Sequence, residues 1–96
     1  MMPFRHVVLL TFADGTDVDA IVAALGALAD EIPELRSYVV GRDAGLSAGN
    51  ASVAVVADFD DVAGFEAYRD DPRHQAVIQE VIRPALVSRA AVQHRT

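Results

Sequence analysis

The sequence contains no cysteine and no lysine, and these two absences exclude several kinds of chemistry. Without cysteine the chain has no disulfide, no thiolate nucleophile and no cysteine metal site. Without lysine it forms no Schiff base on a side-chain amine, and all eight cationic side chains are arginines of fixed charge. Catalysis by this chain therefore has to use other side chains.

Basic charge is scarce as well. The eight arginines face 14 acidic residues, so the net charge is −6 and the isoelectric point is about 4.7. Proteins that bind nucleic acids need a basic surface against the phosphates, often with aromatic residues among the cations. We therefore expect no nucleic-acid partner.

Long apolar runs are also missing, although 52% of the residues are hydrophobic. The longest runs are far shorter than the roughly 20 residues that cross a bilayer. The amino-terminal segment has too short an apolar run for a signal peptide and leads directly into a strand pattern. We therefore expect a cytoplasmic protein without a membrane segment, folded as one domain over residues 1–96.

Alternating apolar residues predict strands over residues 6–12, 35–41 and 52–59, and a weaker pattern predicts a fourth over residues 86–93. The first and third strands are apolar on both faces, which is typical of strands covered on two sides. Residues 41–50 contain three glycines but no phosphate-loop motif, so we interpret them as a connector.

Helical periodicity predicts a first helix that begins at Thr16 as N-cap, with Asp19 completing a variant capping box, and continues to about Ala29. A second helix follows the third strand. The pair Asp71-Pro72 then predicts a break, because proline disfavours helix in the residue before it but suits the first turn of a new helix. Asp71 is the expected N-cap of this third helix.

Two chemically versatile side chains flank the break. Tyr68 ends a series of three residues spaced by three, Val62, Phe65 and Tyr68, along one apolar face of the second helix. His74 is the third residue of the next helix and lies on or beside its apolar stripe. We therefore expect Tyr68 and His74 to share one cavity.

A structural role remains open for each of these residues. A histidine at a helix start can simply bond a backbone carbonyl, and a buried tyrosine needs only one polar partner. His6, at the start of the first strand, is a weaker candidate for ligand binding. No metal site is predicted, because no histidine pair has helical metal-site spacing and the HExxH motif is absent.

The predicted order of elements, β-α-β-β-α-(α)-β, indicates an α+β protein with a ferredoxin-like plait and a four-stranded antiparallel sheet. The helices of such a plait cover only one face of the sheet. Since the strands are apolar on both faces, the second face would expose a large hydrophobic surface. We therefore expect a homodimer in which a second copy covers this face.

Three segments carry a family resemblance: HVVLLTF, VGRDAGLS and VADFDDVAGFEAYRDDPRHQAVIQEVIRP. With these segments, nearly the whole chain resembles the stress-responsive dimeric α/β-barrel (Dabb) family. The resemblance implies a homodimer whose sheets face each other as a dimeric α/β barrel. From a plant polyketide cyclase of this family, it also implies a cofactor-independent aldol reaction with His74 as base, Tyr68 as carbonyl anchor and His6 in the pocket. Asp71 replaces a histidine of that cyclase, so its substrate specificity is not transferred.

Three functions follow as alternatives, none of them with a cofactor. The first is a stress-associated binding module that holds a small apolar or carbonyl-bearing molecule between helices and sheet. The second is a polyketide cyclase-like lyase that uses His74 and Tyr68. The third is a cofactor-free monooxygenase of the dimeric barrel type.

Overall fold

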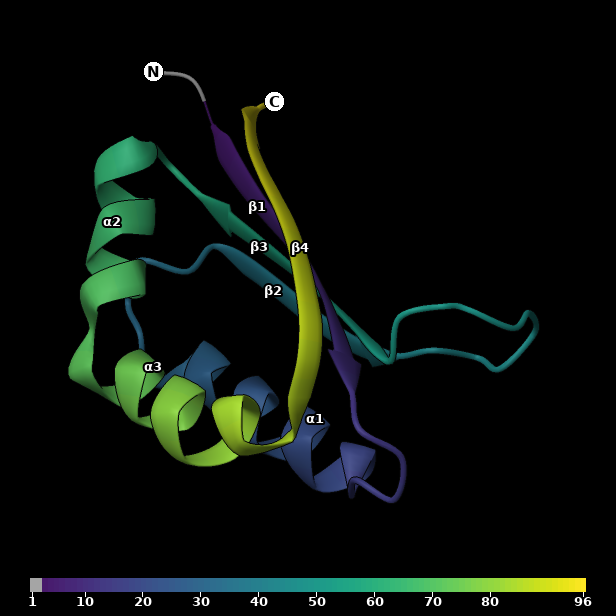
Figure 1. Ribbon diagram of the computed structural model, residues 1–96. Coiled ribbons are helices and arrows are strands. Elements are labelled where there is room, and N and C mark those ends of the chain that lie inside the picture. The colour runs from purple at the N-terminus through teal and green to yellow at the C-terminus, as the bar shows by residue number, and fades with distance from the viewer. Residues whose placement is uncertain (1–2) are drawn as a thin grey trace.

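The computed structural model describes residues 3–96, and its four strands form one antiparallel sheet (Figure 1). The strands are β1 (Phe4–Phe12), β2 (Ser37–Arg42), β3 (Val53–Phe59) and β4 (Leu86–Arg95). They lie in the order β2-β3-β1-β4, so β1 and β3 are central and β2 and β4 are edges. The predicted ferredoxin-like plait is confirmed.

The helices gather on one side of the sheet (Figure 1). They are α1 (Val18–Gly26), the 3₁₀ turn η1 (Ala27–Asp30), α2 (Val62–Asp70), α3 (Pro72–Val77), the π-helical segment η2 (Ile78–Ile82) and the 3₁₀ turn η3 (Arg83–Ala85). Within residues 3–96, no helix has the length and apolar character needed to cross a membrane. The last three segments form one continuous arm that leads into β4.

The start of α1 differs from the prediction. Asp17 is the N-cap, since its Oδ1 accepts a hydrogen bond of 3.1 Å from the backbone N–H of Ala20. The Thr16 hydroxyl instead donates to the carbonyl of Ala13 at 2.6 Å and closes the preceding turn. The prediction of Thr16 was wrong because Thr16 and Asp17 both have side chains that can cap a helix, and the Thr16 hydroxyl is used in the hydrogen bond of the turn. The helix also ends earlier than predicted, where the chain tightens into η1.

The break between α2 and α3 is confirmed. The Asp71 carboxylate accepts a hydrogen bond of 2.8 Å from the backbone N–H of Arg73, and Pro72 is the first residue of α3. Asp71 itself is extended, with φ −60° and ψ 130°, so the chain changes direction there. Tyr68 in the last turn of α2 and His74 in the first turn of α3 are thereby both buried in the interior.

The hydrophobic core lies between the helices and the face of the sheet that they cover. Alternate residues of β1 and β3 point into it, as the buried positions along both strands show. The buried apolar residues are Phe4, Val8, Leu10, Phe12, Ile21, Leu25, Leu28, Ile32, Val53, Val55, Ala57, Phe59, Tyr68 and Ile82. Two histidines, His6 and His74, are the buried polar residues among them.

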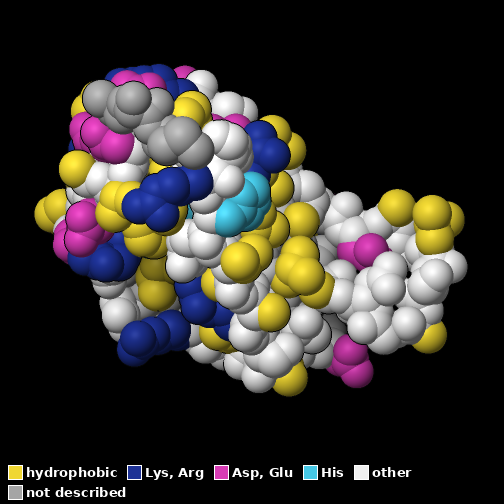
Figure 2. Space-filling view, turned by 90° about the horizontal axis from the view of Figure 1, so that it is seen from above, with side chains coloured by type: hydrophobic (Ala, Val, Ile, Leu, Met, Phe, Trp, Pro, Cys, Tyr) yellow, Lys and Arg dark blue, Asp and Glu magenta, His cyan; other side chains and the backbone are white. Residues whose placement is uncertain are grey.

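The other side of the sheet, here called the outer face, carries two apolar rows across all four strands. The first row is Val39, Val56, Val7 and Val92, and the second is Gly41, Ala54, Leu9 and Ala90. Val39, Val92 and Leu9 are 59%, 54% and 44% exposed. Figure 2 shows hydrophobic side chains gathered on the surface beside the loop that joins β2 and β3 and projects from the body. This face therefore has the composition of an interface rather than of a solvated surface.

Candidate functional site

A pocket of about 360 Å³ lies between the helices and the inner face of the sheet. Its apolar lining residues are Val8, Leu10, Leu25, Val55, Ile78, Ile82 and Leu86. Its polar lining residues are His6, Tyr68, His74, Arg83 and Arg89. The structure thus brings all three predicted site residues to one pocket, whose volume is at the small end of the range for small-molecule sites.

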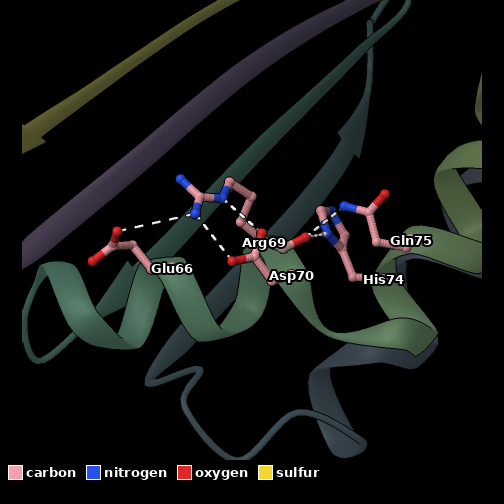
Figure 3. A network of polar contacts seen from close by, with 5 residues as sticks. All are labelled: Glu66, Arg69, Asp70, His74 and Gln75. Atoms are coloured by element: carbon pink, nitrogen blue, oxygen red, sulfur yellow. Dashed lines mark hydrogen bonds and ion pairs between the residues drawn. The ribbon is translucent and has the colours of Figure 1, made fainter.

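His74 is held by the carbonyl at the end of α2 (Figure 3). Its Nδ1 lies 3.1 Å from the backbone oxygen of Arg69, which also accepts a hydrogen bond of 2.6 Å from the side-chain amide of Gln75. A carbonyl oxygen only accepts, so Nδ1 carries the proton, and Nε2 of the neutral ring has a free lone pair. Every buried side-chain nitrogen or oxygen in residues 3–96 has a partner, so the unbonded Nε2 must be accessible.

The charge state of His74 suits a base. Burial lowers the pKa of its imidazole below the usual 6.5, and the positive charge of Arg89 adds to this. The hydrogen bond to the Arg69 carbonyl and the Asp71 carboxylate oppose the effect without cancelling it. The ring is therefore neutral at pH 7, with Nε2 ready to accept a proton.

His6 has the opposite tautomer. It lies on the central strand β1 and is 6% exposed. The side-chain amide of Gln93, opposite it on β4, donates to its Nδ1 at 2.8 Å. Since Nδ1 accepts, the proton of the neutral ring is on Nε2. Burial, followed by the positive charge of Arg89 and by that of His74 when it is protonated in acid, lowers the pKa of His6 to about 4, so this ring is a neutral donor at pH 7.

The two imidazoles therefore present complementary groups to one pocket. His74 offers an acceptor nitrogen and His6 a donor N–H, both neutral at physiological pH. A neutral base beside a hydrogen-bond donor is the arrangement needed to remove a proton next to a carbonyl and to stabilise the resulting oxyanion.

Tyr68 contacts His74 through its ring. The two ring centroids lie 4.1 Å apart with 32° between the planes, and Tyr68 is 2% exposed. Its hydroxyl lies 3.5 Å from the hydroxyl of Tyr38, at the outer limit of a hydrogen bond. Burial, together with Tyr38, raises the pKa of Tyr68, so the phenol stays protonated. This ring contact restricts the orientation of the His74 imidazole.

Sequence reasoning missed four residues of this site: Tyr38, Arg83, Arg89 and Gln93. A usable signal existed for two of them, since Arg89 and Gln93 are four apart on a strand and so share one face. Tyr38 and Arg83 come from a distant strand and a short turn, and no local pattern links them to the histidines.

The histidines predict a loss of stability in acid. In the unfolded chain His6 titrates near 6.5, whereas in the fold it stays neutral down to about 4. Between these values the unfolded state binds more protons, so the free energy of unfolding falls as the pH falls, by about 2 kcal/mol from pH 7 to 5 for His6 alone. Urea unfolding at both pH values, at one protein concentration, measures this loss.

The variant His6→Gln should show a clearly smaller loss than the wild type over the same pH interval. His94→Gln, which changes an exposed histidine at the end of β4, is the matched control and should behave as the wild type. An unchanged pH dependence in His6→Gln would contradict the buried, neutral state of His6.

One known protein family matches the sequence over nearly its whole length. The profile of the stress responsive A/B barrel domain, Dabb, matches residues 4–94. Among curated proteins, none matches the sequence significantly.

Solved structures extend this likeness. A dimeric ferredoxin-like protein of unknown function from Thermobifida fusca is 43% identical, with a TM-score of 0.88 over 99% of this chain and 92% of that one. A hydroxynitrile lyase from Passiflora edulis is 22% identical, with a TM-score of 0.84 over 99% of this chain and 94% of that one. A Dabb family protein from Mesorhizobium loti is 16% identical, with a TM-score of 0.82 over 98% of this chain and 96% of that one. The last two likenesses concern the fold alone.

Proposed function

The chain belongs to the family of stress responsive A/B barrel domains, and on that premise we propose that it is a homodimeric lyase of the aldol type, acting on a small carbonyl compound in each protomer's pocket. One observation carries the proposal. His74 and His6 line the same pocket as neutral rings with opposite tautomers, so a base and an oxyanion donor are present together.

The homodimer is supported by the outer face and by a relative. Two apolar rows cross all four strands, and the Thermobifida fusca protein, 43% identical, is described as dimeric. Packing the two outer faces against each other would cover Leu9, Val39 and Val92 and give the predicted dimeric α/β barrel. The pockets lie on the helix side of each sheet and stay separate from this interface.

The proposed reaction begins with proton removal. His74 Nε2 takes a proton from a carbon between two carbonyl groups, and the electron pair of the broken C–H bond moves onto one carbonyl oxygen. The N–H of His6 Nε2 hydrogen-bonds to this enolate oxygen. The enolate carbon then attacks a third carbonyl group farther along the same molecule. A carbon–carbon bond forms, the enolate oxygen becomes a carbonyl oxygen again, and the electron pair of the attacked C=O bond moves onto its oxygen. This alkoxide takes the proton back from His74. Protons and electrons balance without a further reactant.

Tyr68 supports this reaction through its ring contact with His74, which holds the imidazole in one orientation. His6, rather than Tyr68, is the oxyanion donor. The phenol of Tyr68 remains available as a second donor because it stays protonated. The same fold carries a hydroxynitrile lyase in Passiflora edulis, so lyase chemistry is compatible with this architecture.

Proton exchange tests the proposal without knowledge of the natural substrate. The probe is a β-keto ester with one alkyl group on the carbon between its carbonyls, incubated with the protein in D₂O and followed by ¹H NMR. We expect the signal of the remaining proton to disappear faster than in buffer, at a rate that saturates with probe concentration. Binding of the probe without faster exchange would contradict the lyase and leave only a binding module.

A further inference from the structure

The lining of the pocket is positively charged in an acidic protein. Two arginines, Arg83 and Arg89, line it, and no carboxylate does. Two other surface hollows, by contrast, combine arginine with acidic residues in their linings: Arg36 with Asp60 in one and Arg42 with Asp43 in the other. With 14 acidic residues against eight arginines, such a lining is unexpected from composition alone.

Among the described residues, Arg83 and Arg89 also have no ion-pair partner. Five of the eight arginines form ion pairs with carboxylates: Arg5, Arg36, Arg42, Arg69 and Arg73. Within residues 3–96, neither Arg83 nor Arg89 has a carboxylate within ion-pair distance or a side-chain hydrogen bond. A guanidinium group presents five N–H donors in a planar fork that matches a carboxylate, so these donors are available to a ligand.

The two arginines belong to different secondary-structure elements at the edge of the pocket. Arg83 lies in η3, at the end of the helical arm, and Arg89 lies on β4, opposite Leu10 of β1. Both are exposed, so they stand where the pocket meets solvent. Arg89 lines the same pocket as His6 and His74, and its positive charge lowers the pKa of both rings. An anionic group held by Arg89 therefore lies within reach of the reacting carbonyl.

We propose that the ligand of this pocket is a carboxylate-bearing carbonyl compound, a small keto acid, whose carboxylate is held between Arg83 and Arg89 while its carbonyl meets His6 and His74. The position of the carbonyl group, beside His6 and His74, rests on the proposed function. The apolar remainder of the ligand lies against Leu25 and Ile78. The small volume of the pocket and the absence of an acidic lining residue both favour such a compound over a cationic or a large neutral one.

A matched pair of probes tests the carboxylate. 4-Oxooctanoate and its methyl ester have the same ketone and alkyl chain and differ only in charge. Binding is measured by calorimetry at a pH above 7, where both histidines are neutral with or without Arg89. We expect the acid to bind at least tenfold more tightly than the ester, and added NaCl to weaken the acid alone.

The double variant Arg83→Gln/Arg89→Gln should lose this preference and bind acid and ester equally, at the wild-type affinity for the ester. Arg95→Gln, which removes an arginine of the same strand outside the pocket, is the control and should keep the preference. Equal binding of both probes to the wild type would overturn the keto-acid inference and leave the carbonyl site intact. Failure of both probes to bind would overturn the pocket itself, and with it the proposed function.

Discussion

The variant His74→Asn is expected to lower the rate of probe proton exchange by a factor of about 10² to 10⁴, the usual contribution of a positioned general base. The side-chain amide nitrogen of asparagine can occupy the place of Nδ1 and donate to the Arg69 carbonyl, as the imidazole does at 3.1 Å. The variant therefore removes Nε2, the proposed base, while it keeps the contact that anchors the helix turn.

A second variant, His74→Ala, separates catalysis from stability. His74→Ala removes both the base and the hydrogen bond, so it should lose activity and also about 1 kcal/mol of stability or more. The Arg69 carbonyl keeps its hydrogen bond from Gln75 in both variants, which limits the structural cost. Probe affinity measured by calorimetry should change little in His74→Asn. Equal exchange rates in His74→Asn and the wild type would show that His74 is a structural residue.

The pH profile gives an independent readout of the same group. Because burial lowers the pKa of His74, the exchange rate should be constant above the ordinary range of histidine and fall only at lower pH, where Nε2 becomes protonated. A free imidazole in buffer loses its activity at a higher pH. A profile that coincides with that of free imidazole would contradict a buried base.

The fold could be predicted from the sequence because it depends on patterns within short segments, such as the regular alternation of apolar residues along a strand. Alternation marked the strands, and Asp71-Pro72 marked the change of direction that places Tyr68 and His74 together. The N-cap of α1 could not be predicted, since Thr16 and Asp17 are both competent and the choice depends on a turn formed with Ala13. The π-helical segment η2 was not predicted either, because its residues, IQEVI, contain no glycine or proline that would mark a departure from the α-helix.

The chemistry of the site was less predictable than its location. Which nitrogen carries the proton depends on one carbonyl for His74 and on Gln93 for His6, and Gln93 is 87 residues away along the chain. The shift of the His6 pKa to about 4 depends on burial in the finished fold. Sequence patterns identify residue types and faces, whereas tautomers and charge states arise from contacts between distant segments.

The variant Leu9→Glu is expected to abolish the proposed dimer. Leu9 lies on the central strand β1, 44% exposed, in the second apolar row of the outer face. A two-fold interface places the same patch of both copies in contact, so one substitution buries two unpaired charges. Each costs several kcal/mol, which corresponds to a rise in the dissociation constant of about a thousandfold or more. Sedimentation velocity should show a dimer for the wild type and a monomer for the variant.

Ala23→Glu makes the same charge change at an exposed position of α1, on the other side of the molecule, and should remain dimeric. Thermal unfolding supplies a second test, because the midpoint of a dimer rises with protein concentration and that of a monomer does not. We expect this dependence in the wild type and in Ala23→Glu, and its loss in Leu9→Glu. A Leu9→Glu dimer as tight as the wild type would mean that the outer face is not the interface. The two apolar rows would then need another partner, because a sheet face with Leu9, Val39 and Val92 exposed together is costly to leave in water.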